Sequence, residues 1–184
     1  RTFLKVLKKS IFPIENLYLF SSTKSACTKV IFNKKEYTVE ELTENSFDRD
    51  IQIALFSAGG SISEKFAPIA KSKGVIVVDN SSFWRMNPEV PLVVPEVNPE
   101  DVKKHNGIIA NPNCSTIQAV LPLKTLHDKY KIKRIVYSTY QAVSGSGVNG
   151  VKDLENGIEG KENDFYAKQI AYNCLPHIDV FTEN

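Results

Sequence analysis

The residue with the clearest chemical potential is a cysteine in the run Asn111-Pro112-Asn113-Cys114-Ser115-Thr116. Pro112 cannot continue an incoming strand, Asn113 is a strong N-cap type, and an apolar-periodic helix follows. Cys114 is therefore predicted in the first helical turn, where unpaired N–H groups and the helix dipole favour a thiolate. The same N–H groups could stabilise the oxyanion formed when a thiolate attacks a carbonyl. The competing interpretation is a buried cysteine that acts as a small hydrophobe.

The other two cysteines, Cys27 and Cys174, lie in segments that favour inert roles. No histidine stands at ligand spacing from a cysteine, so the sequence predicts no metal site. The three histidines are isolated and are interpreted as structural or exposed; they are His105, His127 and His177. Three cysteines do not make a disulfide framework, which indicates a reducing compartment. We therefore expect a cytoplasmic protein.

Two glycine-containing turns and one arginine are candidate ligand contacts. Residues 57–61 follow an apolar run and precede a helix pattern, where small residues let a phosphate or ring approach the backbone at the carboxyl edge of a parallel sheet. A tight strand-to-helix turn also needs glycine, and residues 144–147 are equally open to both interpretations. Arg85, next to Trp84, is either a phosphate or carboxylate ligand or a surface arginine packed on an aromatic ring.

The elements expected around these residues make an α/β fold. Residues 51–56 and 74–78 are β-branched runs, typical of strands buried on both faces of a parallel sheet. Residues 61–64 fit a capping box that opens a helix between them, so the segment predicts a βαβ unit. The other expected elements are a helix over 2–9, a strand over 17–20, a hairpin of 29–32 with 36–39, a helix after Cys114, and an alternating strand over 134–141. After Asn80, prolines punctuate a region of short predicted strands and turns, and a predicted helix follows Cys114. This change of pattern predicts a domain boundary near residue 112.

The composition excludes several classes of protein. The chain has 184 residues, of which 42% are hydrophobic and 24% charged, as in soluble globular proteins rather than disordered or low-complexity ones. Lysine and arginine exceed aspartate and glutamate by 23 − 21 = +2, without clusters, so no basic stripe for nucleic acid is present. No apolar run approaches the roughly 20 residues of a transmembrane helix. We expect neither a nucleic-acid nor a membrane partner.

Several runs, in order over nearly the whole chain, are long enough to be specific. They are Phe56-Ser57-Ala58-Gly59-Gly60-Ser61, Asp79-Asn80-Ser81-Ser82, residues 91–98, 111–118 and 138–145, and Pro176-His177-Ile178-Asp179-Val180-Phe181. Together they resemble aspartate-semialdehyde dehydrogenase of the bacterial type. The related N-acetyl-glutamyl-phosphate reductase has a glycine before its catalytic cysteine and a different residue after it. Asn113 and Ser115-Thr116 favour the semialdehyde enzyme.

The resemblance implies an NADP-dependent oxidoreductase that works through a covalent thioester. Cys114 matches the nucleophile that attacks L-aspartate 4-semialdehyde; hydride then leaves to NADP, and phosphate cleaves the thioester to L-4-aspartyl phosphate. Gln141 matches the residue that orients the substrate near the thiol. Asn113, directly before Cys114, is expected to be one of the catalytic residues. Arg85 matches the arginine that holds phosphate. The implied cofactor contacts are Lys24, Ser25, Ala26, Ser57, Gly59, Ser144 and Gly145.

The resemblance further implies a homodimer that serves the biosynthesis of lysine, threonine and methionine. Lys24 stands where the family often has an arginine, and it would hold the 2′-phosphate of NADP less rigidly than an arginine fork. Cys27 replaces a glycine that is usual in the cofactor loop, which either narrows that site or relaxes a turn. Two alternatives stay open: a related acyl-phosphate reductase, and a non-catalytic fragment that binds a nucleotide or a partner.

The chain also departs from the family at both ends. No residue in 1–184 matches the family's Gly-rich phosphate loop, its substrate-binding arginine or its acid/base histidine, so we expect the loop upstream of Arg1 and the other two downstream of Asn184. We therefore expect an internal fragment that is inactive alone. Residues 1–112 are predicted to form a Rossmann-like NADP-binding domain without its first strand. Residues 113–184 are predicted to begin an α+β catalytic and dimerisation domain.

Overall fold

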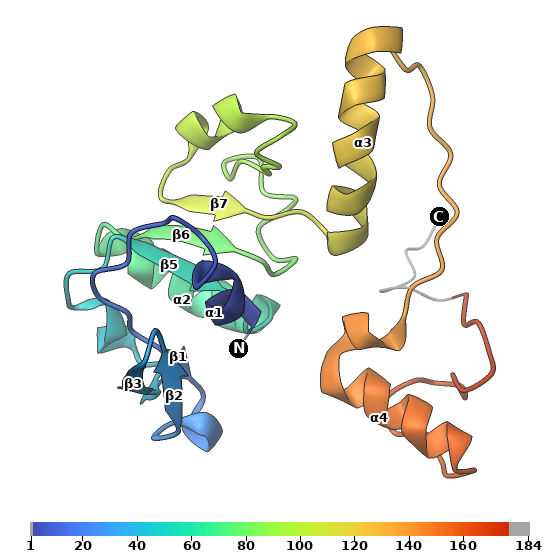
Figure 1. Cartoon of the computed structure of the whole chain (residues 1–184), viewed down its shortest axis with the longest axis horizontal. Helices are drawn as coiled ribbons and strands as arrows, with labels where there is room; N and C mark the ends of the chain where they lie inside the picture. The colour runs from blue at the N-terminus through green and yellow to red at the C-terminus, as the bar shows by residue number, and fades with distance from the viewer. Residues whose placement is uncertain (1, 177–184) are drawn as a thin grey trace. The chain divides into compact units, whose positions relative to one another are not determined.

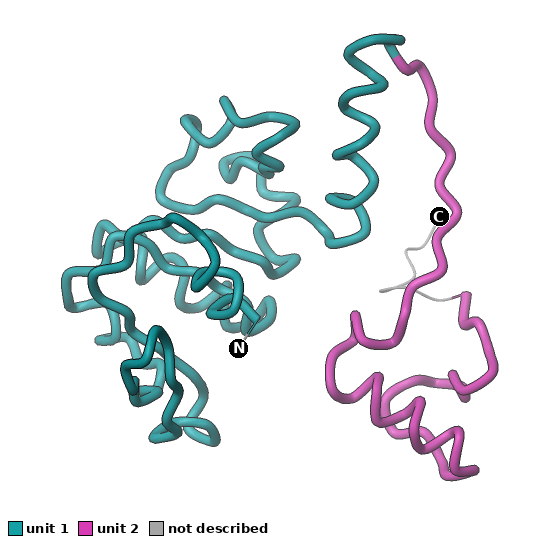
Figure 2. The backbone as a smooth tube through the Cα atoms, viewed as in Figure 1, with its two compact units in different colours: residues 1–131 teal, residues 132–184 magenta. Residues whose placement is uncertain are grey.

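A computed structural model describes residues 2–176 of the chain. The chain divides into two units, residues 1–131 and residues 132–184, coloured separately in Figure 2. Among the described residues, no helix has the length and apolar character needed to span a bilayer.

A three-stranded parallel sheet forms the centre of the first unit (Figure 1). Its strands, in spatial order, are β5 (Ile53–Phe56), β6 (Ile76–Asp79) and β7 (Ile108–Ala110). The helix α2 (Gly60–Ser72) connects β5 to β6 and packs against the sheet. The predicted βαβ unit and the α/β fold class are therefore confirmed. All three strands run in the same direction, so their carboxyl ends share one edge.

The core lies between α2 and the sheet. Phe66, Ala67 and Ala70 of α2 are buried against Val77 of β6 and Ile108 of β7. The small alanines let the helix approach the β-branched strands closely, and burying a Val or Ile side chain contributes about 1.5–3 kcal/mol. The short helix η2 (Glu44–Phe47) extends this core. Its Phe47 ring stacks on Phe56, with 6.1 Å between the centroids.

The start of α2 differs from the prediction. The helix begins at Gly60, and its N-cap is Gly59, which makes no side-chain cap bond. The predicted capping box over 61–64 is therefore wrong. Gly59 has φ +96°, a conformation that L side chains rarely adopt, so glycine sets this turn. Ser63 is buried in the first turn of α2, and its Oγ accepts a hydrogen bond from Nε1 of Trp84 (3.0 Å), which ties this turn to the segment after β6.

The amino-terminal part of the first unit carries shorter elements. They are α1 (Thr2–Leu7), β1 (Phe20–Ser21), η1 (Thr23–Ser25), β2 (Lys29–Phe32), β3 (Lys35–Thr38) and β4 (Glu40–Glu41). The predicted hairpin is confirmed, because β2 and β3 pair antiparallel. The predicted strand over 17–20 is reduced to the two residues of β1, which pair with β4. The predicted helix over 2–9 is confirmed as α1, but none of its residues is buried.

After β6 the chain passes through η3 (Pro99–Lys104) to β7 and then to α3 (Cys114–Tyr130). The predicted helix after Cys114 is thus confirmed, with no residue of α3 buried in the described structure. Leu121 and Leu126 are among its exposed apolar side chains. Packing against a core therefore does not fix the position of this helix. The contacts at its amino-terminal end contribute more to its placement.

The second unit contains η4 (Val143–Ser146) and α4 (Gly147–Ile158). The strand predicted over 134–141 is wrong, since these residues carry no strand and pair with no other described segment. An alternating pattern forms a strand only where a neighbouring strand accepts its hydrogen bonds. The helix α4 was not predicted, because its glycines at 147, 150 and 157 weaken the helical signal.

Asp153 organises the second unit. Its carboxylate is buried in α4 and accepts three backbone N–H bonds, from Asp164 (2.9 Å), Phe165 (2.9 Å) and Tyr166 (2.7 Å). Burial is the largest single influence and opposes the charge, but the three N–H donors together outweigh it. The pKa of Asp153 is therefore held below its ordinary value. The ionised carboxylate thus fixes the turn over 164–166 against the helix.

Candidate active site at the carboxyl edge of the sheet

The helix start at Cys114 has the local geometry that the sequence predicts. The Oδ1 atom of Asn113 accepts hydrogen bonds from the backbone N–H groups of Ser115 (2.9 Å) and Thr116 (3.2 Å). Asn113 is therefore the N-cap of α3, as predicted. Cys114 is the first residue of the helix and is exposed, so the alternative of a buried hydrophobic cysteine is wrong.

The cap also limits which N–H groups can face a ligand. Those of Ser115 and Thr116 are taken by the Asn113 side chain, and that of Ile117 donates to the Asn113 carbonyl (3.0 Å). Within the described residues, the N–H of Cys114 itself has no protein acceptor. The expected oxyanion donors at this helix start are thereby reduced to that one group.

Arg85 is bound to the same edge of the sheet. Its Nε donates to the carbonyl of Asn111 (3.0 Å), and its Nη2 donates to the carbonyl of Asn80 (3.1 Å). Arg85 is half-buried, and the neighbouring Trp84 ring packs edge-on with Phe83. Because a guanidinium has five N–H donors, three are left over for an anion. The arginine is therefore held in one orientation while donors for a phosphate or carboxylate are retained.

Two asparagines that the sequence analysis did not assign lie at this edge. Asn80 directly follows β6 and Asn111 directly follows β7, and their side chains are joined by a hydrogen bond from Nδ2 of Asn111 to Oδ1 of Asn80 (2.7 Å). Asn80 Nδ2 reaches Ser57 Oγ, the first residue after β5, at 3.4 Å. The signal available in the sequence was the position of each polar residue directly after a strand.

The candidate cofactor residues fall in several places. Ser57 and Gly59 form the turn between β5 and α2, and a Cβ added at Gly59 would meet no atom within 4 Å, so the main chain of this turn is open to a ligand. Lys24 and Ser25 are exposed in η1 and Ala26 follows it, all in the first unit. Their cofactor roles stay predictions.

Three of the predicted site residues belong to the second unit. Gln141 precedes η4, and Ser144 and Gly145 lie within it. In the first unit, Ser57 and Arg85 are bonded to the residues directly after β6 and β7, and Asn113 and Cys114 follow β7 in the chain. The substrate and cofactor roles of the three second-unit residues stay predictions.

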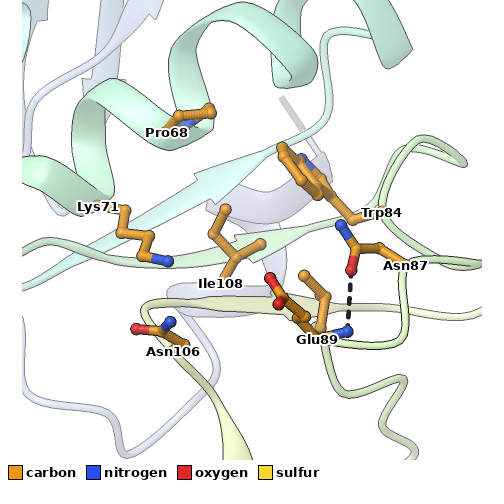
Figure 3. A pocket seen from close by; sticks show the side chains of 8 residues that line it. Pro68, Lys71, Trp84, Asn87, Glu89, Asn106 and Ile108 are labelled. Atoms are coloured by element: carbon orange, nitrogen blue, oxygen red, sulfur yellow. Dashed lines mark hydrogen bonds between the residues drawn. The ribbon is translucent and has the colours of Figure 1, made fainter.

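A small cavity lies at the opposite end of the sheet (Figure 3). Lys71 comes from the last turn of α2 and Ile108 is the first residue of β7, so the cavity is near the amino end of that strand. Its volume is about 120 Å³, smaller than the roughly 300–1,000 Å³ of ordinary ligand sites. Figure 3 shows the side chains of Trp84, Ile108, Glu89 and Asn106 among those that line it. Cys114 is not among its lining residues.

Residue types that bind metals are dispersed in the described part of the chain. Across residues 2–176, no three His, Cys, Asp or Glu side chains gather in a way that could hold a metal ion. All three cysteines are free and exposed. Cys27 has φ +63°, in the left-handed region that favours glycine.

Comparisons with known proteins identify the family of the chain. Residues 1–105 match the family described as "Semialdehyde dehydrogenase, NAD binding domain", and residues 123–184 match "Semialdehyde dehydrogenase, dimerisation domain". The aspartate-semialdehyde dehydrogenase of Aquifex aeolicus is 58% identical over 194 aligned positions, which cover 100% of this chain and 57% of that protein. The chain therefore spans little more than half the length of the curated relatives it matches.

Solved structures give the same result. Aspartate semialdehyde dehydrogenase II of Vibrio cholerae, complexed with ASA, superposes with a TM-score of 0.91 at 43% identity, covering 99% of this chain and 56% of that one. The enzyme of Candida albicans with NADP gives a TM-score of 0.60 at 26% identity, covering 71% of this chain and 44% of that one. With both family descriptions in order along the sequence and the fold shared with a solved member, the chain belongs to the semialdehyde dehydrogenase family.

Proposed function

We propose that the complete protein is an aspartate-semialdehyde dehydrogenase that interconverts L-aspartate 4-semialdehyde plus phosphate and L-4-aspartyl phosphate. The observation that carries the proposal is Cys114, exposed at the capped start of α3, directly after the segment that Arg85 holds. This pairs a nucleophile with a cation that can bind an anionic co-substrate. The relatives named for this activity support the same assignment.

In the proposed mechanism, the Cys114 thiolate adds through Sγ to the aldehyde carbon and forms a thiohemiacetal whose oxygen carries the negative charge. The N–H of Cys114 is the donor available at the helix start for the oxygen that becomes negative. NADP, when bound, accepts the hydride that leaves this carbon, so that a thioester remains on Sγ. An oxygen of phosphate, held by the free N–H groups of Arg85, then attacks the thioester carbon and expels the Cys114 thiolate. Gln141 orients the substrate for both steps.

The cofactor assignment starts from the turn between β5 and α2. The open turn at Gly59 fits the approach of a dinucleotide, because no side chain covers its main chain. Lys24 is the proposed partner of the 2′-phosphate, with Ser25, Ala26, Ser57, Ser144 and Gly145 as further contacts. A preference for NADP over NAD is supported by the related enzyme whose structure contains NADP.

The wider biological setting follows from the same assignment. We propose a cytoplasmic homodimer that serves lysine, threonine and methionine biosynthesis; the match of residues 123–184 to a dimerisation domain supports the dimer. Residues 1–112 are proposed as the cofactor-binding domain and residues 113–184 as the beginning of the catalytic domain.

The function is tested by adding L-aspartate 4-semialdehyde, phosphate and NADP to the complete protein and following NADPH formation. The expected result is phosphate-dependent turnover. Turnover with N-acetyl-glutamate semialdehyde but not with the aspartate compound would instead identify a related acyl-phosphate reductase. Absence of turnover with both substrates would contradict the enzymatic assignment and favour a binding role.

A further inference from the structure

A row of polar side chains joins the carboxyl ends of all three strands. Ser57, Asn80 and Asn111 are the first residues after β5, β6 and β7, and they are linked by the bonds Asn111 Nδ2 to Asn80 Oδ1 (2.7 Å) and Asn80 Nδ2 to Ser57 Oγ (3.4 Å). The central Asn80 uses its acceptor toward one neighbour and its donor toward the other. The shorter bond joins β6 to β7, the strand that leads to Cys114.

Arg85 ties the main chain of the same two asparagines. Its Nε and Nη2 donate to the carbonyls of Asn111 (3.0 Å) and Asn80 (3.1 Å). The backbone N–H of Asn111 also donates to the carbonyl of Asp79 (2.8 Å), and the backbone N–H of Asn80 donates to the carbonyl of Phe56 (2.9 Å). The position of Asn111 is thus defined by its side chain, its N–H and its carbonyl together.

The connection from Asn111 to Cys114 has little freedom. Pro112 is buried and its ring locks φ, so it cannot rotate as an ordinary residue would. Asn113 is fixed in turn by its cap bonds to Ser115 and Thr116. Since α3 has no buried residue, this short connection is what relates the Cys114 thiol to Arg85 within the first unit.

We propose that Asn80 and Asn111 are positioning residues that hold Cys114 and Arg85 in their productive relation. This inference rests on the proposed function and deepens it: the proposed mechanism assigns no chemical step to either asparagine, and the inference gives both a role in holding the residues that react. The hydrogen bond between the Asn80 and Asn111 side chains, called the bridge below, aligns the Cys114 thiol with the Arg85 guanidinium. Its loss should misplace one of these groups relative to the other. A misplacement of about 1 Å can lower turnover by about 100-fold.

The test is a double-mutant cycle in the complete protein with Asn80→Ala, Asn111→Ala and the double variant. The main-chain bonds of both residues remain, and Asn80 is exposed, so the fold is expected to persist. We expect kcat to fall by about tenfold or more in each single variant, with the KM for NADP within twofold. The double variant should lose no more kcat than the larger single loss, because one bridge is broken in all three.

Asn106→Ala is the matched control, since Asn106 is exposed and lies ahead of β7, by the cavity of Figure 3. Hydrogen exchange of residues 113–118 provides a second measurement, expected to be faster in the Asn80 and Asn111 variants and unchanged over α2.

The outcomes separate the inference from the function on which it rests. A wild-type protein without turnover contradicts the proposed function. An active wild-type protein whose Asn80→Ala and Asn111→Ala variants keep full kcat overturns the positioning role, and so do additive losses in the double variant. Unchanged hydrogen exchange over 113–118 overturns it as well, whatever the activity.

Discussion

Removing the Asn113 side chain should loosen the first turn of α3 without unfolding the molecule. The side chain satisfies two backbone N–H groups, those of Ser115 at 2.9 Å and Thr116 at 3.2 Å. Replacing an N-cap asparagine by alanine costs about 1 kcal/mol, which corresponds to a roughly fivefold change in the opening equilibrium. Water can reach this exposed turn, so the larger penalties of buried unpaired donors do not apply.

The loss should be local because α3 buries no residue in the described structure. Amide hydrogen exchange of Ser115 and Thr116, measured by NMR, is expected to become about fivefold faster in Asn113→Ala. Exchange of the α2 amides should stay unchanged, since that helix is held by the core.

Asn113→Ser is the matched control, because serine caps helices about as well as asparagine. Its exchange rates should lie close to those of the wild type. Equal acceleration in the alanine and serine variants, or no acceleration in either, would refute the view that the Asn113 cap fixes the start of α3.

Three further predictions concern other parts of the chain. Arg85→Ala in the complete protein should raise the KM for phosphate about 10–100-fold, because a charged hydrogen bond is worth about 1.5–3 kcal/mol. The kcat should fall as well, since the carbonyls of Asn80 and Asn111 lose their donor. An equal rise in the KM for NADP would contradict a phosphate role. Cys27→Gly should raise the free energy of unfolding in urea by up to about 1 kcal/mol, since Cys27 has φ +63°, and a loss of stability would show that the turn tolerates a side chain without strain. Asp153 has a lowered pKa, so its contribution to stability is complete above the ordinary aspartate pKa and is lost as the pH falls through the folded value. Unfolding of the wild type should therefore become easier below about pH 4, whereas Asp153→Asn should be less stable at pH 7 and lack this pH-dependent step; a variant with the wild-type pH profile would contradict the role of the carboxylate.

Local sequence signals predicted the elements whose determinants are local. The β-branched runs before and after α2 identified β5 and β6. The expected burial on both faces is wrong for β5, because α2 covers one face and the side chains of Ile53 and Leu55 are exposed. Pro112 followed by Asn113 located the start of α3 to the residue, since both act within one turn of the helix.

The errors arose where distant residues decide the structure. Residues 61–64 fit a capping box, but α2 already begins at Gly60, and the Ser63 hydroxyl inside that segment accepts a hydrogen bond from the Trp84 indole, 21 positions away. The alternation over 134–141 fits a strand, yet no described segment supplies a partner. The bond between Asn80 and Asn111 spans 31 positions and depends on the pairing of β6 with β7. No local pattern encodes such a contact.

If Cys114 carries the substrate as a thioester, mass spectrometry of the complete protein should detect that intermediate. After incubation with L-aspartate 4-semialdehyde and NADP without phosphate, we expect an acyl adduct on the peptide containing Cys114, formed together with NADPH. Adding phosphate should remove the adduct, and Cys114→Ala should form neither adduct nor NADPH, while Cys27→Ser and Cys174→Ser behave as the wild type. NADPH formation by Cys114→Ala, or an adduct on another residue, would show that Cys114 is not the nucleophile.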